Sequence, residues 1–454
     1  MATLIVEPRP EDINVVDVGL ELLDMKHILE KEEVTWDKRP AFEIVRGFSF
    51  GIYQNVTSVR QLIATVNAAS IDGLELPKRG TYRFLRAEDH DLRSILRGGI
   101  APEKTRPSDL ILLDDSPNER TGRQMEGTSL THSTTAGGRI FGHCLLNAYH
   151  AGAEASGFVD FELKMNKKTK KGYRRRGRLQ AGPARALHLP LRALALAIID
   201  REKARGNKAK TVVADTGFFS KGFCRRLRRR GRHWVLAAKV NTRVEYRGEL
   251  MKLRELFHNV RSTKSFGDAR YRVFNVVLPG YGPVRAFFIR FVDRNGNWHT
   301  RYLLTDLTKR KASARSVLRK YLRRWTIEIG HRTTKETFNL RGYHGRSFCG
   351  HVNFYALVML AHQIAEAVTH LWEVHESAQE SVPTLAFRFR LAVIMRGSAS
   401  TSAAATKPRS TTGVTAWPRG RINMRKGSYG QLETMMGTTL DFASPVETMP
   451  VSTS

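Results

Sequence analysis

The sequence predicts an α/β protein with a mixed sheet, a helical N-terminal region and an unstructured tail. Within residues 106–375, apolar runs and helical patterns follow in the order strand, strand, strand, helix, strand, helix, strand, which is typical of an α/β layer. Residues 241–306 contain several β-branched and aromatic runs and a DRNGN hairpin turn, so this part is predicted to be β-rich. Residues 1–105 contain helical patterns, whereas residues 376–454 are mostly small and polar without periodicity, which predicts disorder.

The composition restricts the classes of function. Hydrophobic side chains make up 41% of the 454 residues, enough for a core, so wholesale disorder is excluded. The chain has 75 Lys and Arg residues against 43 Asp and Glu residues, which gives a formal net charge of +32. Self-repulsion at this charge opposes a compact fold, and binding to a polyanion offsets it. The expected partner is therefore DNA or RNA rather than a small anion.

The cysteines and the apolar segments indicate a soluble protein of a reducing compartment. Cys144, Cys224 and Cys349 are far apart and form no Cys-x-x-Cys pair, which argues against a disulfide framework and a cysteine zinc site. The N-terminus has no basic segment followed by an apolar one, so no secretory signal is expected. The most apolar stretch, residues 354–361, is too short to span a bilayer, and we expect no membrane partner.

The N-terminal region has one clear helical pattern. A helix is predicted over residues 57–70, and a basic segment with Lys78, Arg79 and Arg83 follows Gly73. A small helical DNA-binding module has this pattern, but so do many ordinary helical subdomains, and the sequence leaves both interpretations open.

The α/β part consists of short segments separated by glycine. Strands are predicted at 109–115, 138–150, 156–165, 210–219 and 233–240, and helices at 186–206 and 220–232. The loop at 164–178 and the helix at 220–232 together contain sixteen Lys and Arg residues and no acidic residue. We expect both to contact DNA, with a solvated surface as the alternative.

A long helix is predicted from about Ser313 past Lys335, and a second, apolar helix from 351 to 372. At about 100° per residue, five side chains of the first helix fall within a stripe of roughly 80°. They are Tyr321, Arg324, Glu328, Arg332 and Lys335. The stripe presents one carboxylate among cations, which suits a site that holds a phosphate backbone beside a reacting group.

Acidic residues end two of the predicted strands. Asp114 and Asp115 end one apolar run and Asp215 ends another. Groups that face ligands gather where the strands of an α/β sheet end. Taken alone, each of these acids is more simply explained as a turn, cap or solvated residue. Taken with Glu328, they predict a cluster of carboxylates.

Converging carboxylates repel one another, and a divalent cation relieves the repulsion. Mg²⁺ prefers oxygen ligands and is usually held by one or two carboxylates and a substrate phosphate. Two such ions about 4 Å apart activate a water or a 3′-hydroxyl for in-line attack at phosphorus. The combination therefore indicates metal-dependent phosphoryl chemistry on a nucleic acid.

The spacing of Tyr321, Arg324, Glu328 and Lys335, written Y-x₂-R-x₃-E-x₆-K, resembles the signature of a large group of bacterial and archaeal insertion-sequence transposases. In that family the Glu is the third member of an Asp-Asp-Glu triad on a ribonuclease-H-like fold. The segment VVADTGFFS resembles the family's second-Asp segment, which maps onto Asp215, and LILLDDS resembles the first-Asp segment.

The resemblance implies which residues hold metal. In the family, Thr or Ser directly follows the first Asp, which favours Asp115, followed here by Ser116, over Asp114. Only one of the two can face the site in a regular strand. The implied catalytic and metal-binding residues are therefore Asp115, Asp215 and Glu328, holding two Mg²⁺ ions for which Mn²⁺ substitutes. The resemblance also implies that residues 241–306 form a β-rich insertion in the ribonuclease-H-like catalytic core.

The resemblance further implies the activity and the partners. The implied activity is hydrolysis of the phosphodiester at the ends of an insertion sequence, followed by strand transfer of the freed 3′-hydroxyl into target DNA, by a cut-and-paste route with a hairpin intermediate as one option. The DNA-binding residues would be Tyr321, Arg324, Arg332 and Lys335. The partners would be double-stranded DNA, as terminal inverted repeats and target, and a second copy of the chain in a homodimer. The expected location is the cytoplasm of a bacterium or archaeon, at the nucleoid.

Two other functions stay open from the sequence. One is a catalytically inactive DNA-binding protein derived from a transposase, which an atypical C-terminal tail would fit. The other is a general nuclease of the ribonuclease-H type, which would cleave without regard to terminal sequence.

Overall fold

The computed structural model describes ten segments of the chain. They are residues 14–36, 40–69, 74–122, 124–133, 136–164, 189–258, 263–267, 269–292, 297–376 and 381–404. The basic loop predicted at 164–178 lies outside the described residues apart from Lys164, and so does the end of the chain from 405 on. The chain divides into two compact units, one formed by Met1–Leu236 with Ser316–Lys407 and the other by Ala237–Arg315 with Pro408–Ser454.

The N-terminal part of the first unit is helical, in agreement with the sequence pattern. Its helices are α1 (Val15–Leu22), α2 (Met25–Lys31), α3 (Ala41–Tyr53), α4 (Val59–Ala68), α5 (Lys78–Arg86) and α6 (Arg93–Gly99). The start of α4 shows why a helix forms there: the Ser58 hydroxyl accepts a hydrogen bond from the Gln61 amide, and the Gln61 side chain accepts one from the Thr57 amide.

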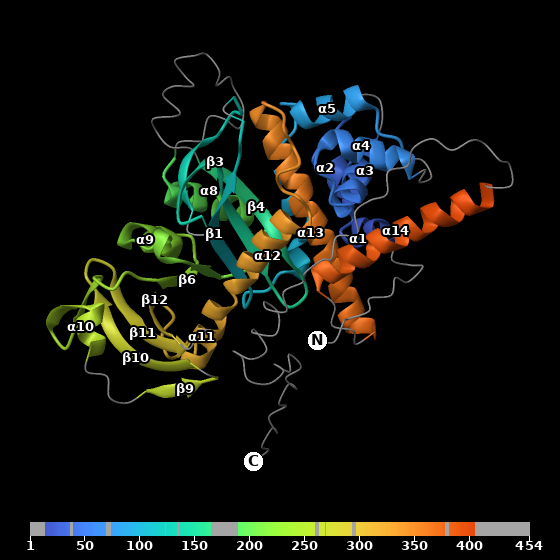
Figure 1. Ribbon diagram of the computed structural model, residues 1–454. Helices are drawn as coiled ribbons and strands as arrows, with labels where there is room; N and C mark the ends of the chain where they lie inside the picture. Colours follow the sequence, from blue (N-terminus) through green and yellow to red (C-terminus); the bar gives the residue numbers. More distant parts are fainter. Residues whose placement is uncertain are drawn as a thin grey trace. The chain divides into compact units, whose positions relative to one another are not determined.

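A long apolar helix, α13 (Phe348–Glu376), joins these helices to the sheet. It packs against α1, α3, α5 and α6 on one side and against the strand β4 (Ser156–Lys164) on the other (Figure 1). Its residues between 352 and 365 are buried almost without exception, so the apolar helix predicted at 351–372 is confirmed as a core element.

The sheet of the first unit is mixed, as predicted. Its strands are β1 (Leu110–Glu119), β2 (Ser129–Ser133), β3 (Gly138–Ala151), β4, β5 (Thr211–Ala214) and β6 (His233–Ala237). The strand order is β2-β3-β1-β5-β6, with β4 paired to β3. Strand β1 is antiparallel to β3 and parallel to β5, which is parallel to β6. The helices α8 (Leu191–Ala204) and α9 (Lys221–Arg229) precede and follow β5, which gives the predicted alternation.

The long helix predicted from Ser313 is interrupted. It forms α11 (Ala314–Leu322) and α12 (Trp325–Glu336). At the junction the Arg324 amide donates to the Tyr321 carbonyl and the Thr326 amide to the Arg323 carbonyl, each over three residues rather than four. This tighter turn rotates α12 relative to α11, so the predicted single stripe from Tyr321 to Lys335 is not continuous.

Part of the predicted disordered tail is instead helical. Helix α14 spans Val382–Ala404, and it buries Leu385, Ala386 and Phe389. The Phe389 ring lies 5.1 Å from that of Phe50 and 5.3 Å from that of Tyr53. The spacing of these buried residues is the helical one, and the small polar run that follows them in the sequence obscures it.

The second unit is β-rich, as the sequence indicates. Its described elements are β7 (Arg243–Tyr246), β8 (Glu249–Lys252), α10 (Leu253–His258), β9 (Lys264–Phe266), β10 (Ala269–Leu278), β11 (Gly282–Val292) and β12 (Trp298–Thr305). The order is β12-β11-β10-β7-β8, with β9 paired to β10, and every pairing among β7 to β12 is antiparallel. Helix α10 covers this sheet with Phe257, which stacks on Phe288 at 5.2 Å.

The described helices do not include one with the length and apolar character needed to cross a bilayer.

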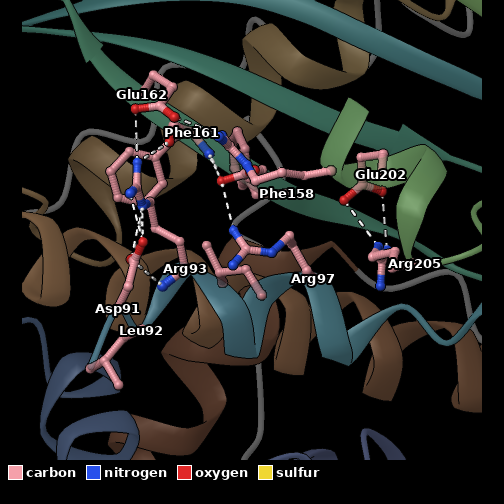
Figure 2. Close-up of polar contacts among 12 residues, drawn as sticks. Asp91, Leu92, Arg93, Arg97, Phe158, Phe161, Glu162, Glu202 and Arg205 are labelled. Carbon is pink, nitrogen blue, oxygen red and sulfur yellow. Dashed lines mark hydrogen bonds and ion pairs between the residues drawn. The ribbon is translucent and has the colours of Figure 1, made fainter. Parts of the chain in front are cut away.

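Paired charges connect helix α6 to the sheet (Figure 2). The Arg93 guanidinium donates to Asp91 at 2.6 Å and to the Glu162 carboxylate of β4 at 2.8 Å. Arg201 of α8 donates to the same Glu162 and to Asp160, both at 2.7 Å. Because Asp160 and Glu162 are almost fully buried, their charges depend on these partners. The network therefore couples the N-terminal helices to β4 and α8.

We predict that Arg93→Met destabilises the protein by about 3–5 kcal/mol, because it removes the cation that pairs with the partly buried Asp91 and one of the two that pair with the buried Glu162. The free energy of unfolding from urea titration measures the effect. Lys203→Met, at an exposed position of α8, is the control and should change it by less than about 0.5 kcal/mol. A loss below about 1 kcal/mol in Arg93→Met would show that the network does not contribute to the docking of α6.

Candidate active site

The register of two parallel strands brings two of the expected acids together. Leu113 of β1 pairs with Ala214, the last residue of β5, so the next residues, Asp114 within β1 and Asp215 just after β5, are neighbours on adjacent chain segments. Adjacent strands lie about 4.8 Å apart. Asp215 has an extended backbone and begins the short helix Thr216–Phe218. Asp215 is thus placed where the sequence predicted a ligand-facing acid, at a strand end.

The structure places Asp114, and not Asp115, on the side of β1 that faces α12. Asp114 pairs with Asn147 of β3, whose amide contacts His331 of α12 at 2.8 Å. Asp115 is exposed on the opposite side, where its carboxylate lies 3.8 Å from the Cys144 sulfur. The geometry thus favours Asp114 as the first acid of the site, whereas the sequence analysis favoured Asp115. Only one of the two faces α12, because side chains alternate along a strand.

Helix α12 brings the third acid to the same place. Arg324, at the N-terminal end of α12, forms an ion pair with Glu328 one turn later. Burial by itself lowers the pKa of Arg324, but nearby negative groups outweigh burial and raise it above its usual value. These groups are Tyr321, Glu328, Asp114 and Asp215. The Glu328 carboxylate is ion-paired with this guanidinium, and the carboxylates of Asp114 and Asp215 are near enough to act on it electrostatically.

Asp114 has an unusual proton affinity. Burial, together with the negative charges of Glu328 and Asp115, raises the pKa of its carboxyl group from 3.8 to about 7, although Arg324 acts in the opposite direction. The side chain is 17% exposed. A carboxyl group whose pKa is raised in this way, close to other acids, is typical of a functional site.

His331 and Asn147 complete the surroundings of Asp114, and the sequence analysis did not assign them to the site. The His331 Nδ1 atom lies 3.6 Å from the Asp114 Oδ2 atom. Burial, Lys335 and other nearby cations lower the pKa of His331 to about 3, so the ring is neutral near pH 7. With the Asn147 amide donating to Nε2, the ring proton lies on Nδ1 and faces Asp114. His331 follows Glu328 by three residues, a spacing that could have indicated a shared helix face.

The other residues of the predicted stripe have different environments. Lys335 donates from Nζ to the Pro117 carbonyl of β1 at 2.9 Å, which ties α12 to that strand. Arg332 is exposed. Tyr321, expected to contact DNA, is only 7% exposed and lies beneath Arg324, 5.7 Å from its guanidinium. The interrupted helix explains this, because Tyr321 belongs to α11 and packs inward.

Close packing sets the position of α12. A Cβ atom on Gly330 would lie 2.9 Å from the Phe158 ring of β4, so only glycine lets the helix approach the sheet this closely. The approach brings Glu328, two residues earlier, to the level of Asp114.

A side chain from α8 supports the turn that follows Asp215. Arg192 donates from Nε to the Phe218 carbonyl at 2.9 Å and from Nη2 to the carbonyls of Gly217 and Phe219 at 3.1 and 3.0 Å. Three hydrogen bonds from one rigid guanidinium fix the backbone of this turn. The contact spans 25 residues of sequence, so no local pattern reveals it.

In the part of the chain that the structure describes, no three His, Cys, Asp or Glu side chains have the spacing of a metal site. Asp114, Asp215 and Glu328 are near one another, but Glu328 is directed to Arg324. The expected metal cage is therefore not formed by the side chains in this arrangement.

Two family models match the chain. Residues 191–364 match the family described as "Transposase DDE domain", and residues 55–255 match the family described as "DDE superfamily endonuclease". The first match includes Asp215 and Glu328, and the second includes Asp114 and Asp215. The two matches together cover residues 55–364, which include all three acids, so the chain is similar to transposase-type DDE endonuclease domains. The resemblance to DDE transposase domains is therefore confirmed, without showing a particular subgroup.

A search of curated proteins found no match. Among solved structures, the chain is similar to one from a "Cryo-EM structure of piggyBac transposase synaptic complex with hairpin DNA", with a TM-score of 0.44 and 11% sequence identity. The similarity covers 91% of this chain and 87% of that chain.

The raised pKa of Asp114 predicts a pH-dependent stability. The folded state binds the Asp114 proton more tightly than the unfolded state, so the free energy of unfolding falls as the pH rises from about 4 to about 7. In Asp114→Asn the free energy of unfolding should not show this fall. Its difference from the wild-type value should therefore grow by up to about 1.4 kcal/mol per pH unit in that range. Urea titrations with a chelator at several pH values measure the gain. Asp115→Asn, at the exposed neighbour, removes only a minor cause of the raised pKa and should show a much smaller gain. Parallel curves for Asp114→Asn and the wild type would contradict the prediction.

We also predict that Arg192→Gln loosens the turn after Asp215. The amides of residues 216–219 should exchange hydrogen faster, by about 5- to 30-fold, since loss of 1–2 kcal/mol of local stability raises opening by that factor. Hydrogen exchange with mass spectrometry measures the rate. Lys203→Gln on the same helix is the control. Unchanged exchange in Arg192→Gln would mean that the three hydrogen bonds do not hold the turn.

Proposed function

We propose that this chain is a DNA transposase of an insertion sequence, of the group with the Tyr-Arg-Glu-Lys signature. It would hydrolyse the phosphodiester at the ends of the element and transfer the freed 3′-hydroxyl into target DNA. The observation that supports this most directly is that β1 and β5 place Asp114 beside Asp215, while α12 carries Glu328, paired with Arg324, near enough to act on Asp114. The matches to DDE transposase and endonuclease domains support the same conclusion. In this proposal Asp114 takes the role that the sequence analysis assigned to Asp115.

The donor chemistry of the site fits a hard divalent cation. All three side chains offer carboxylate oxygen, the donor that Mg²⁺ prefers. Burial and, to a smaller extent, the neighbouring acids raise the pKa of Asp114, and a bound cation would favour its ionised form. Asp114, Asp215 and Glu328 would hold two Mg²⁺ ions, with Mn²⁺ as a substitute. When bound, the ions would activate the attacking water or 3′-hydroxyl and stabilise the leaving oxygen. The β-rich second unit would be the insertion of the ribonuclease-H-like core.

Cations around the acids would position the DNA. The Nε donor of Arg324 is buried without an acceptor among the described residues, and a phosphate oxygen is a suitable acceptor for it. Lys335 and Arg332 lie farther along α12 and would contact the backbone near the scissile bond. Tyr321 would act through Arg324, against which it packs. His331 would orient the Asp114 carboxylate.

The partners follow from the proposed reaction. They are double-stranded DNA, as terminal inverted repeats and as target, and a second copy of the chain in a homodimer that bridges two ends. The net charge of +32 suits such a polyanionic partner. The proposed location is the nucleoid of a bacterial or archaeal cell.

One observation favours a second candidate, a catalytically inactive DNA-binding protein derived from a transposase. Glu328 is engaged by Arg324, and the described side chains do not form a metal cage. If this pairing persists with DNA bound, the chain would bind DNA without cleaving it.

Cleavage of DNA separates these candidates. With Mg²⁺ and a duplex built from the flanks of the coding sequence, wild-type protein should cleave at a defined end. Asp114→Asn and Glu328→Gln should each lower the rate by at least about 100-fold, since loss of one preorganised charged group costs 10²–10³. Asp115→Asn is the matched control and should keep most of the activity.

Each alternative predicts a different result. Cleavage that persists in Glu328→Gln would exclude the proposed site, and loss in Asp115→Asn with activity in Asp114→Asn would return the first ligand to Asp115. Cleavage without regard to terminal sequence would indicate a general nuclease, and binding without cleavage would indicate the inactive protein.

A further inference from the structure

Helix α9 has an exposed face made of cations. The segment 220–232 contains seven Lys and Arg residues, and no acidic residue occurs between Asp215 and Glu245. Phe223, Cys224 and Leu227 point inward and are buried. The exposed positions are Lys221, Arg225, Arg226, Arg228 and Arg229.

Two bases at the end of this segment serve the fold. Arg230 forms an ion pair with Asp200 of α8, with distances of 2.6 and 2.7 Å. Arg232 is buried and donates to the Asn207 carbonyl at 3.0 Å and to the Ala209 carbonyl. Packing and ion pairing therefore account for Arg230 and Arg232, whereas the three cations Lys221, Arg225 and Arg229 are exposed.

Three of the exposed cations follow one another at helical spacing, and we call them the α9 stripe: Lys221, Arg225 and Arg229. Like charges four residues apart destabilise a helix by about 0.2–0.5 kcal/mol per pair. Lys221 also lies in the first turn, where the helix dipole disfavours a cation. The dipole favours Arg229 in the last turn, so the unfavourable contributions are the like-charge pairs and Lys221, and a bound polyanion would offset them.

The stripe has dimensions that suit one strand of DNA. Eight residues of helix span about 12 Å. Phosphates of one strand repeat about every 3.4 Å along the duplex axis, so the stripe covers roughly three of them. Lys and Arg side chains bind phosphate oxygens without regard to sequence, so the exposed cations of this face suit contacts to the DNA backbone.

The position of α9 connects the stripe to the candidate site. The helix begins one residue after Ser220, which accepts a hydrogen bond from the Phe223 amide as its N-cap. Asp215 precedes Ser220 by five residues, through the turn that Arg192 holds. Lys221 is thus the cation of the stripe nearest to Asp215 in the chain, and the stripe leads away from the strand end.

We infer that the α9 stripe binds the phosphate backbone of the duplex DNA whose scissile bond lies at Asp114, Asp215 and Glu328. The inference rests on the proposed function, which supplies the DNA. The contact is independent of sequence and positions the duplex, while chemistry takes place at the carboxylates.

The test is the salt dependence of DNA binding without cleavage. Full-length protein binds a fluorescent duplex in EDTA, and the dissociation constant is measured by anisotropy between about 50 and 200 mM salt. The stripe variant combines Lys221→Gln, Arg225→Gln and Arg229→Gln. Each lost phosphate contact reduces the slope of log K against log salt by about 0.9, so a reduction of about 2–3 is expected.

Two control variants distinguish a direct contact between the stripe and phosphate from the effect of a lower net charge. Lys203→Gln, Lys208→Gln and Lys210→Gln together remove the same charge from exposed positions before β5, and they should change the slope by less than about 1. Arg225→Lys with Arg229→Lys keeps the charge and should keep the slope. Circular dichroism checks that each variant is folded.

An unchanged slope in the stripe variant, or an equal change in the Lys203, Lys208 and Lys210 variant, would overturn the inference. The inference would also fail if binding of the wild-type protein to DNA did not depend on salt. It would fail as well if the stripe variant lost affinity for a single-stranded RNA but not for duplex DNA. These results are independent of cleavage. If the slope is unchanged in the stripe variant but cleavage still depends on Glu328, the inference fails and the proposed function stands. If the slope falls but no Glu328-dependent cleavage is found, the proposed function fails and the stripe remains a DNA-binding surface.

Discussion

The balance of charge around Arg324 is the interaction on which the candidate site depends. Three carboxylates from separate elements lie near one guanidinium in a partly desolvated place, where their mutual repulsion is stronger than in water. Burial together with the neighbouring acids raises the pKa of Asp114, and Arg324 offsets this rise only in part. Additional positive charge would therefore stabilise the ionised carboxylates, and in the proposed chemistry Mg²⁺ would supply it.

The rest of the first unit holds these elements in place. The parallel register of β1 and β5 sets Asp114 beside Asp215, Lys335 ties α12 to β1, and Gly330 lets α12 approach β4. The turn after Asp215 is held by a single arginine of α8. Farther away, the buried ion pairs of Arg93 and Arg201 connect the N-terminal helices to β4. Preorganised charge is useful only on a rigid support, and these contacts provide one.

Much of the site could be predicted from local patterns. Asp215 was identified because it ends an apolar run, and Glu328 because it lies among cations on one face of a predicted helix. The mixed sheet and the β-rich segment also followed from periodicity and turns. Two predictions were wrong where distant contacts decide: the long helix was predicted without its break, and α14 was not predicted. The structure also places Asp114, rather than the preferred Asp115, beside α12.

The sequence by itself determined the order of the elements, the two strand-end acids, the carboxylate on the helix and the excess of positive charge, because each is a property of neighbouring residues or of composition. Only the tertiary structure decided that Asp114 faces α12, that Tyr321 lies beneath Arg324, that His331 contacts Asp114 and that Arg192 holds the turn after Asp215. The reason is physical: which side of a strand meets a helix, and which side chain reaches a distant carbonyl, depends on packing between segments that are far apart in the chain.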